Sequence, residues 1–340
     1  MALRRTGMLT DPTRLLFSLD PADLPGLGRY LESLAWAKAS DVLQAERIGD
    51  GNMNLTVRVH TAAGPYILKQ AKPYVVKYPQ IAAPVERAAV EAAFYRLTAT
   101  DAAVSQSMPR LLGFSEEAHL LWLEDLGDAG DCMACYGGQP LLENECLQLT
   151  AFLANLHAVP IPADALPILR NRAMRALNHE HQYDLPLRPG NGLDLDRITP
   201  GLGALAAELL ANSEYRRRVT ELGERYLQDG LALLHGDFFP GSWLRAARGL
   251  AVIDPEFGFA GEPEYDLGVF LAHLELIGAR HFWPVVRAAY SLPLDWPLAQ
   301  RYAGAELMRR LIGVAQLPLL AELEAKRQWL ALSKELVCGQ

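Results

Sequence analysis

The sequence predicts an α+β protein in which a small β-rich lobe precedes a larger, mostly helical lobe. Residues 31–123 contain short runs of alternating apolar and polar side chains, which are typical of strands. After residues 124–127, long stretches with apolar side chains at helical spacing follow one another. We therefore expect an N-terminal lobe over residues 1–123, a C-terminal lobe over residues 124–340 and a hinge at about 123–127.

The individual elements follow from periodicity and from turn residues. Strands are expected in the first lobe at 54–60, 66–70, 110–114 and 119–123. Pro84 is expected to open a helix over 85–97, because proline suits the first helical turn. Helices of the second lobe are expected at 143–158, 203–229, 264–276, 298–317 and 319–336, with a break at Pro318. The one clear sheet signal there is a hairpin of 243–245 with 250–254, and 184–203 is expected to be irregular.

Composition excludes several classes of function. The chain has 340 residues and a formal net charge of -8, without a long Lys/Arg run, so nucleic-acid binding is not expected as its main task. It shows neither a signal-peptide pattern nor the roughly 18 uncharged apolar residues of a membrane helix. We expect a cytoplasmic protein. Cys132-x-x-Cys135 lacks a second ligand pair at zinc spacing, so ordinary thiols are expected.

Two short acidic motifs have side chains that suit phosphoryl transfer. Asp237, in His-Gly-Asp, is expected to be the base that orients and deprotonates a hydroxyl nucleophile. Asp254 ends a run of apolar residues, so its carboxylate is expected at a strand end, where it can bind Mg²⁺. Glu256 is expected to bind a second metal or a water of the first, and Ser242 is a weaker candidate ligand. His235 is expected to brace the loop without taking part in the chemistry.

A second set of residues suits the binding of a nucleotide such as ATP. The candidate phosphate loop consists of Gly49, Asp50, Gly51, Asn52 and Asn54. Glycines let backbone amides approach phosphate oxygens, although the same residues also make a good hairpin turn. Lys69, at a strand end, is expected to contact the phosphates and to pair with Glu91 of the following helix. Glu86 is the rival partner, but it lies about 140° away around the helix and is expected to face solvent.

Three further features complete the candidate site. Glu124 and Leu126 lie in the expected hinge, where backbone groups can bind adenine. Asp266 lies near the start of a helix, and we favour a structural role that braces the catalytic loop over simple capping. Arg309 and Arg310 are neighbours on an apolar helix and point about 100° apart. On their spacing alone, we expect one surface arginine and one internal ion pair.

The order of these motifs resembles that of the aminoglycoside phosphotransferase and choline kinase superfamily, whose members have a two-lobed, protein-kinase-like fold. Within it, the chain is most similar to the 5-methylthioribose kinase family. The matching stretches are Gly49–Asn54, Leu68–Val75, His235–Asp237 with Gly241-Ser242, Val252–Phe257 and Arg309–Gly313. Ser242, five residues after Asp237, and the Asp-x-Glu pair of Asp254 and Glu256 are features of that family.

The resemblance implies a transferase that uses Mg²⁺ and ATP to phosphorylate the C1 hydroxyl of methylthioribose in methionine salvage. It also implies a homodimer. For Arg309 and Arg310, it favours contacts with the sugar hydroxyls over the role expected from their spacing. The loop departs from the family at Phe238-Phe239-Pro240, where leucine, histidine and threonine are expected. Two phenylalanines beside the base favour a more apolar acceptor.

Two alternatives remain open at this point. The enzyme can act on another acceptor, such as an aminoglycoside or an amino alcohol, because the excess of acidic residues suits a cation. It can also be a non-catalytic pseudokinase. Ser242 gives this reading its only support, and Lys69, Asp237 and Asp254 argue against it.

Overall fold

The computed structural model describes residues 17–49 and 53–339. The chain forms two compact units, residues 1–92 with 111–125 and residues 93–110 with 126–340. The division falls within helix α2 (Arg87–Thr98). Residues 93–110, expected in the first lobe, therefore group with the second unit.

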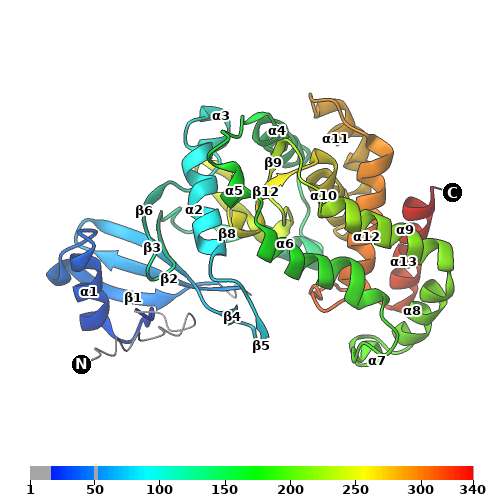
Figure 1. The fold of residues 1–340 in the computed structure, drawn as a ribbon, viewed down its shortest axis with the longest axis horizontal. Helices are drawn as coiled ribbons and strands as arrows, with labels where there is room; N and C mark the ends of the chain where they lie inside the picture. Colours follow the sequence, from blue (N-terminus) through cyan, green and yellow to red (C-terminus); the bar gives the residue numbers. More distant parts are fainter. Residues whose placement is uncertain (1–16, 50–52, 340) are drawn as a thin grey trace, which may run out of the picture. The chain divides into compact units, whose positions relative to one another are not determined.

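The first unit contains a five-stranded antiparallel sheet with the order β1-β2-β3-β7-β6 (Figure 1). Its strands are β1 (Val42–Arg47), β2 (Asn54–Thr61), β3 (Gly64–Ala71), β6 (Leu111–Ser115) and β7 (Leu120–Glu124). The four predicted strands are confirmed, whereas β1 and the separate pair of β4 (Tyr74–Val75) and β5 (Tyr78–Ala82) were missed. Helix α1 (Leu24–Ser33) begins where the Asp23 side chain accepts from Gly26 N, and its buried Leu27 and Leu31 pack with Val57 and Leu68 of the sheet.

The second unit is mostly helical, as predicted. Its longer helices are α4 (Glu143–Ala158), α6 (Arg172–His179), α8 (Leu202–Ala211), α9 (Ser213–Tyr226), α10 (Pro263–Leu276), α12 (Trp296–Ile312) and α13 (Leu323–Cys338). Helix α12 packs against both α10 and α13, which buries nearly all its side chains from Leu298 onward. Within the described part of the chain, no helix is long and apolar enough to cross a membrane.

Several predicted boundaries in this unit are wrong for local reasons. The helix expected at 203–229 is two helices, because Asn212 ends α8 and its side chain caps α9 by accepting from Tyr215 N. Helix α12 ends at Ile312, before Gly313, and does not extend to Pro318. The region 184–203 contains the short helix α7 (Leu195–Ile198).

In the second unit, three short strands escaped prediction, although the hairpin of β10 (Trp243–Ala246) and β11 (Gly249–Val252) is confirmed. These strands are β8 (Gly130–Asp131), β9 (Ala232–Leu234) and β12 (Phe259–Gly261). Strands of two or three residues are too short to show a periodic pattern. The pairing of β9 with β12 matters most, because the loop that carries Asp237 follows β9.

Candidate active site

The His-Gly-Asp loop turns sharply as it leaves β9, and only glycine suits its centre. Gly236 has a φ of 85°, and a Cβ built on it would lie 2.2 Å from the backbone oxygen of Phe257. A side chain at this position would therefore meet both backbone strain and a clash. The turn places Asp237, which is partly exposed, directly after two fully buried loop residues, His235 and Gly236.

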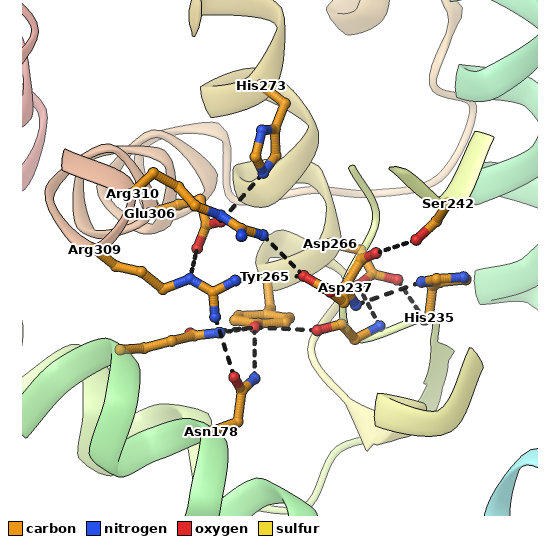
Figure 2. A network of polar contacts seen from close by, with 12 residues as sticks. Asn178, His235, Asp237, Ser242, Tyr265, Asp266, His273, Glu306, Arg309 and Arg310 are labelled. Atoms are coloured by element: carbon orange, nitrogen blue, oxygen red, sulfur yellow. Dashed lines mark hydrogen bonds and ion pairs between the residues drawn. The ribbon is translucent and has the colours of Figure 1, made fainter. Parts of the chain in front are cut away.

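Four hydrogen bonds fix the backbone and side chains of the same loop, and several of their residues are drawn in Figure 2. The Asp266 carboxylate, on α10, accepts from His235 N at 2.6 Å and from Gly236 N at 2.9 Å. Nε2 of His235 donates to the Ile253 carbonyl at 2.9 Å, and the Ser242 hydroxyl donates to the Asp237 carbonyl at 3.0 Å. The predicted bracing roles of Asp266 and His235 are confirmed.

Both arginines of α12 reach the same oxygen of Asp237 (Figure 2). Oδ1 of Asp237 lies 3.1 Å from Nη2 of Arg310 and 3.4 Å from Nη2 of Arg309. Each arginine is only 5% exposed. The prediction of one surface arginine is therefore wrong, because α10 and α13 pack against α12 and leave neither arginine on the surface.

Glu306, one helical turn earlier on α12, holds the two guanidinium groups together. Its Oε1 accepts from Nε of Arg310 at 2.6 Å, and its Oε2 lies 3.0 Å from Nε of Arg309. Burial acts to raise the pKa of Glu306, but the two guanidinium charges outweigh it and lower that pKa below its usual value. Sequence reasoning missed Glu306, although its spacing of three and four residues from the arginines was a readable signal.

Arg309 also connects Asp237 to a group of buried polar residues that the sequence did not reveal. Its Nη1 donates to Asn178 Oδ1 at 3.1 Å, and Asn178 on α6 donates in turn to the Tyr265 hydroxyl at 3.3 Å. The same hydroxyl donates to the carbonyl of Gly236 at 3.3 Å. The arginine pair and the His-Gly-Asp loop are therefore parts of one network.

The two phenylalanines after Asp237 have different surroundings. Phe238 is fully buried and its ring stacks on Phe152 at 5.9 Å, so it belongs to the core. Phe239 is partly exposed, and its ring lies 4.9 Å from the guanidinium of Arg310. The expectation that both rings adjoin the base is wrong for Phe238.

Two of the three predicted magnesium ligands, Asp254 and Glu256, lie just after β11, and the third, Ser242, lies just before β10. Asp254 has a φ of 64°, a conformation that is costly for a non-glycine residue and that often accompanies function. Glu256 is 4% exposed, and the hydroxyl of Ser242 donates to the Asp237 carbonyl. The described residues contain no group of three or more His, Cys, Asp or Glu placed to hold a metal. Two carboxylates nevertheless fit Mg²⁺, which takes most of its other ligands from water and substrate phosphates.

In the first unit, the predicted Lys69–Glu91 ion pair is confirmed. Nζ of Lys69 lies 2.9 Å from the Glu91 carboxylate, and the two residues are 3% and 1% exposed. Glu86 is exposed, as expected. A charge buried this deeply stays ionised only if it is well compensated, so the pair fixes the lysine head in one place.

The structure describes only part of the predicted phosphate loop. Asp50, Gly51 and Asn52 lie outside the described residues, and Gly49 has a φ of 65°. Oδ1 of Asn54 accepts from Nε of Arg87 at 3.0 Å, and Nη2 of Arg87 donates to the Met53 carbonyl at 2.9 Å. Arg87, which the sequence reasoning missed, therefore fixes the start of β2.

The predicted hinge residues are divided between the two units. Glu124 ends β7 opposite Tyr66, and the Asp125 carboxylate accepts from Nε of Arg58 at 2.7 Å. Leu126 is the first residue of the second unit after this point. The compact units thus divide within the predicted hinge.

Comparison with known proteins identifies the family. The phosphotransferase enzyme family matches residues 44–302. The chain belongs to this family. A methylthioribose kinase of Exiguobacterium sibiricum is 31% identical over 69% of this chain, a match that spans 61% of that protein. A methylthioribose kinase of Bacillus cereus is 25% identical, with 91% of this chain and 90% of the relative covered.

Solved structures of proteins with a similar fold confirm the predicted fold class. A spectinomycin phosphotransferase in complex with ADP and spectinomycin has a TM-score of 0.50 and 15% identity, covering 87% of this chain and 93% of that one. A choline kinase from Streptococcus pneumoniae has a TM-score of 0.51 and 12% identity, covering 92% and 98%. The fold is therefore kinase-like, with a β-rich N-terminal and a helical C-terminal unit.

Proposed function

We propose that the protein is an ATP-dependent kinase that transfers the γ-phosphoryl group to a hydroxyl of 5-methylthioribose or a closely related sugar. The observation that carries the proposal is the convergence of Arg309 and Arg310 on Asp237. The methylthioribose kinases among its relatives support the choice of acceptor and a place in methionine salvage.

Asp237 is the group that moves the proton in this reaction. Its carboxylate accepts the proton of the acceptor hydroxyl as that oxygen forms a bond to the γ-phosphorus, while the bond from phosphorus to the leaving ADP oxygen breaks. The braced loop keeps the carboxylate in place, because its backbone is tied to Asp266 on α10. Such positioning supplies much of the catalysis in phosphoryl transfer.

The arginine pair favours a neutral, hydroxyl-rich acceptor. Guanidinium groups only donate hydrogen bonds, so they suit the oxygens of a sugar. The amino groups of a polycationic aminoglycoside are also hydrogen-bond donors, so they find no acceptor on the two guanidiniums. The position of both arginines at Asp237 therefore argues against the aminoglycoside alternative.

The remaining predicted residues are assigned to Mg-ATP. Lys69, fixed by Glu91, is proposed to contact the phosphates, with Gly49 and Asn54 in the loop beside them and backbone groups near Glu124 and Leu126 at adenine. Asp254 and Glu256 are proposed to hold Mg²⁺. When bound, the metal neutralises charge that develops on the phosphate oxygens.

The first test is phosphorylation of an acceptor panel of methylthioribose, ribose, choline, homoserine and kanamycin with Mg-ATP. We expect turnover of methylthioribose. Asp237→Asn should lower kcat by about 10²- to 10⁴-fold while ATP binding persists, because it removes the base. Asp164→Asn, a change at an exposed position, is the matched control. Activity confined to kanamycin or choline would reject the sugar, and undiminished turnover by Asp237→Asn would reject the mechanism.

A second test addresses the nucleotide. Glu91→Gln removes the charge that fixes Lys69 and should raise the KM for ATP by about tenfold or more, whereas Glu86→Gln on the same helix should leave it unchanged. Equal KM values for ATP in the two variants would remove Lys69 from the nucleotide site.

A further inference from the structure

Two buried chains of tyrosine, histidine and carboxylate approach Asp237. The first, which we call the arginine relay, consists of Tyr136, His273 and Glu306. The Tyr136 hydroxyl lies 2.6 Å from Nδ1 of His273, and Nε2 of His273 lies 3.2 Å from Oε1 of Glu306. The Glu306 carboxylate then contacts both arginines. The relay therefore ends on the side chains that reach Asp237 (Figure 2).

The second chain, which we call the loop relay, has the same chemistry. The Tyr290 hydroxyl lies 2.8 Å from Nδ1 of His157, and Nε2 of His157 lies 3.2 Å from Oδ2 of Asp266. Asp266 accepts from the backbone of His235 and Gly236. This relay ends on the backbone of the catalytic loop.

Helix α10 supplies one member of each relay. Asp266 and His273 are seven residues apart, which is nearly two helical turns, so their side chains leave the same side of the helix. Both residues are fully buried. The two relays are thus fixed to one rigid element, yet one acts on side chains and the other on backbone.

Protonation of the arginine relay follows from its partners. Burial lowers the pKa of His273 to about 4, so the ring is neutral near pH 7. An ionised carboxylate only accepts, so Nε2 of the ring donates to Glu306 and Nδ1 accepts from the Tyr136 hydroxyl. Each proton of this relay has one partner.

The arginine relay limits how Arg310 can turn. Its Nε donates to Glu306, its Nη2 donates to Asp237, and its guanidinium lies against the Phe239 ring. A carboxylate held by His273 is less free to rotate than one held by the arginines alone. The planar guanidinium therefore presents fixed donors beside the base.

We infer that Tyr136, His273 and Glu306 are positioning residues that set acceptor affinity by orienting Arg309 and Arg310. They act through the arginines and not on the reacting atoms. This inference rests on the proposed function, because it assigns the two arginines to the acceptor.

The test compares Tyr136→Phe with Tyr290→Phe, since each removes one buried hydroxyl bonded to Nδ1 of a histidine. Tyr136→Phe should raise the KM for methylthioribose by about 3- to 10-fold, the worth of one hydrogen bond, with kcat and the KM for ATP near wild type. Tyr290→Phe should lower kcat without that rise in KM. An unchanged acceptor KM in Tyr136→Phe, or the same kinetic change in both variants, would overturn the inference.

A readout without acceptor keeps the inference separate from the proposed function. The Nε–H signal of Arg310 in a ¹⁵N correlation spectrum, assigned with Arg310→Lys, should shift or broaden in Tyr136→Phe and stay in place in Tyr290→Phe. No movement in Tyr136→Phe would reject the relay. Lack of methylthioribose turnover by the wild-type protein, with the Arg310 signal moved as expected, would reject the proposed sugar and retain the positioning role.

Discussion

The pattern Glu-x-x-Arg-Arg occurs twice in this chain, once exposed on α9 and once buried on α12. On α9, Oε1 of Glu214 lies 2.6 Å from Nη2 of Arg217 and 2.8 Å from Nε of Arg218, and their side chains are 33–51% exposed. On α12, the Glu306 carboxylate lies 3.0 Å and 2.6 Å from the two arginines, and the side chains are 2–6% exposed. The same helical spacing gives the same ion pairs in two very different environments.

The difference shows that burial, and not the pattern, makes the second cluster a functional candidate. Hydrogen bonds from Arg217 and Arg218 lower the pKa of Glu214 to about 2, yet water already solvates these three groups. Glu306 has lost that water, and its pKa is nevertheless held low by two guanidiniums. A cluster of this kind needs every charge compensated, and Asp237 supplies the last one.

The largest expected effect is on stability when the two glutamates are neutralised. Glu306→Gln should lower the free energy of unfolding by about 3–5 kcal/mol, because two buried guanidiniums lose a shared partner. Glu214→Gln should leave the melting temperature unchanged within error. Denaturant unfolding of both variants checks this, and equal midpoints would mean that burial adds nothing to the α12 cluster.

The next effect concerns pH, since a buried histidine accompanies only the α12 cluster. His273 has a pKa of about 4 in the folded protein and about 6.5 when unfolded. The unfolded chain therefore binds a proton first as the pH falls, and the protein should lose roughly 3 kcal/mol of stability between pH 6.5 and 4. His273→Gln should remove the largest part of this slope, leaving what the lowered pKa values of His119 and His179 contribute, and exposed His281→Gln should keep it. An unchanged slope in His273→Gln would assign it to other groups.

The sequence predicted those parts of the site that depend on neighbours in the chain. The strand of Lys69, the helix of Glu91, the position of Asp254 just after a strand and the His-Gly-Asp loop follow from local periodicity and motif order, and the Lys69–Glu91 pair is present. The bracing role of Asp266 was also predicted, and the structure shows it in the two hydrogen bonds to the His235 and Gly236 backbone.

The contacts made across the second unit could not be predicted. Asn178 on α6 contacts Arg309 over a separation of 131 residues, and Tyr136, in the turn at 132–137, contacts His273 over 137 residues. No periodicity encodes such contacts. The burial of both Arg309 and Arg310 was missed for the same reason: α10 and α13 cover α12 from both sides.

Removal of both arginines from one cluster at a time should distinguish the α12 cluster from the α9 cluster by enzyme kinetics. Arg309→Ala with Arg310→Ala should raise the KM for methylthioribose by about 100-fold, because two charge-assisted donors are lost beside Asp237. The same pair of changes at Arg217 and Arg218 should leave the KM for methylthioribose and the KM for ATP unchanged. Steady-state kinetics on both double variants checks this. An unchanged acceptor KM in the α12 variant would return the choice of acceptor to the aminoglycoside or choline class.

The smallest effect distinguishes charge from shape. Arg310→Lys keeps the positive charge, but an ammonium on a flexible stem cannot contact Glu306, Asp237 and the Phe239 ring with fixed donors and a flat face at once. The KM for methylthioribose should therefore rise by about tenfold, less than in the double alanine variant. Arg217→Lys should have no kinetic effect, since water on the exposed face of α9 can solvate both the new ammonium and Glu214. A wild-type acceptor KM in Arg310→Lys would mean that charge alone suffices in the buried cluster, and that its fork-like geometry is as dispensable as that of the exposed one.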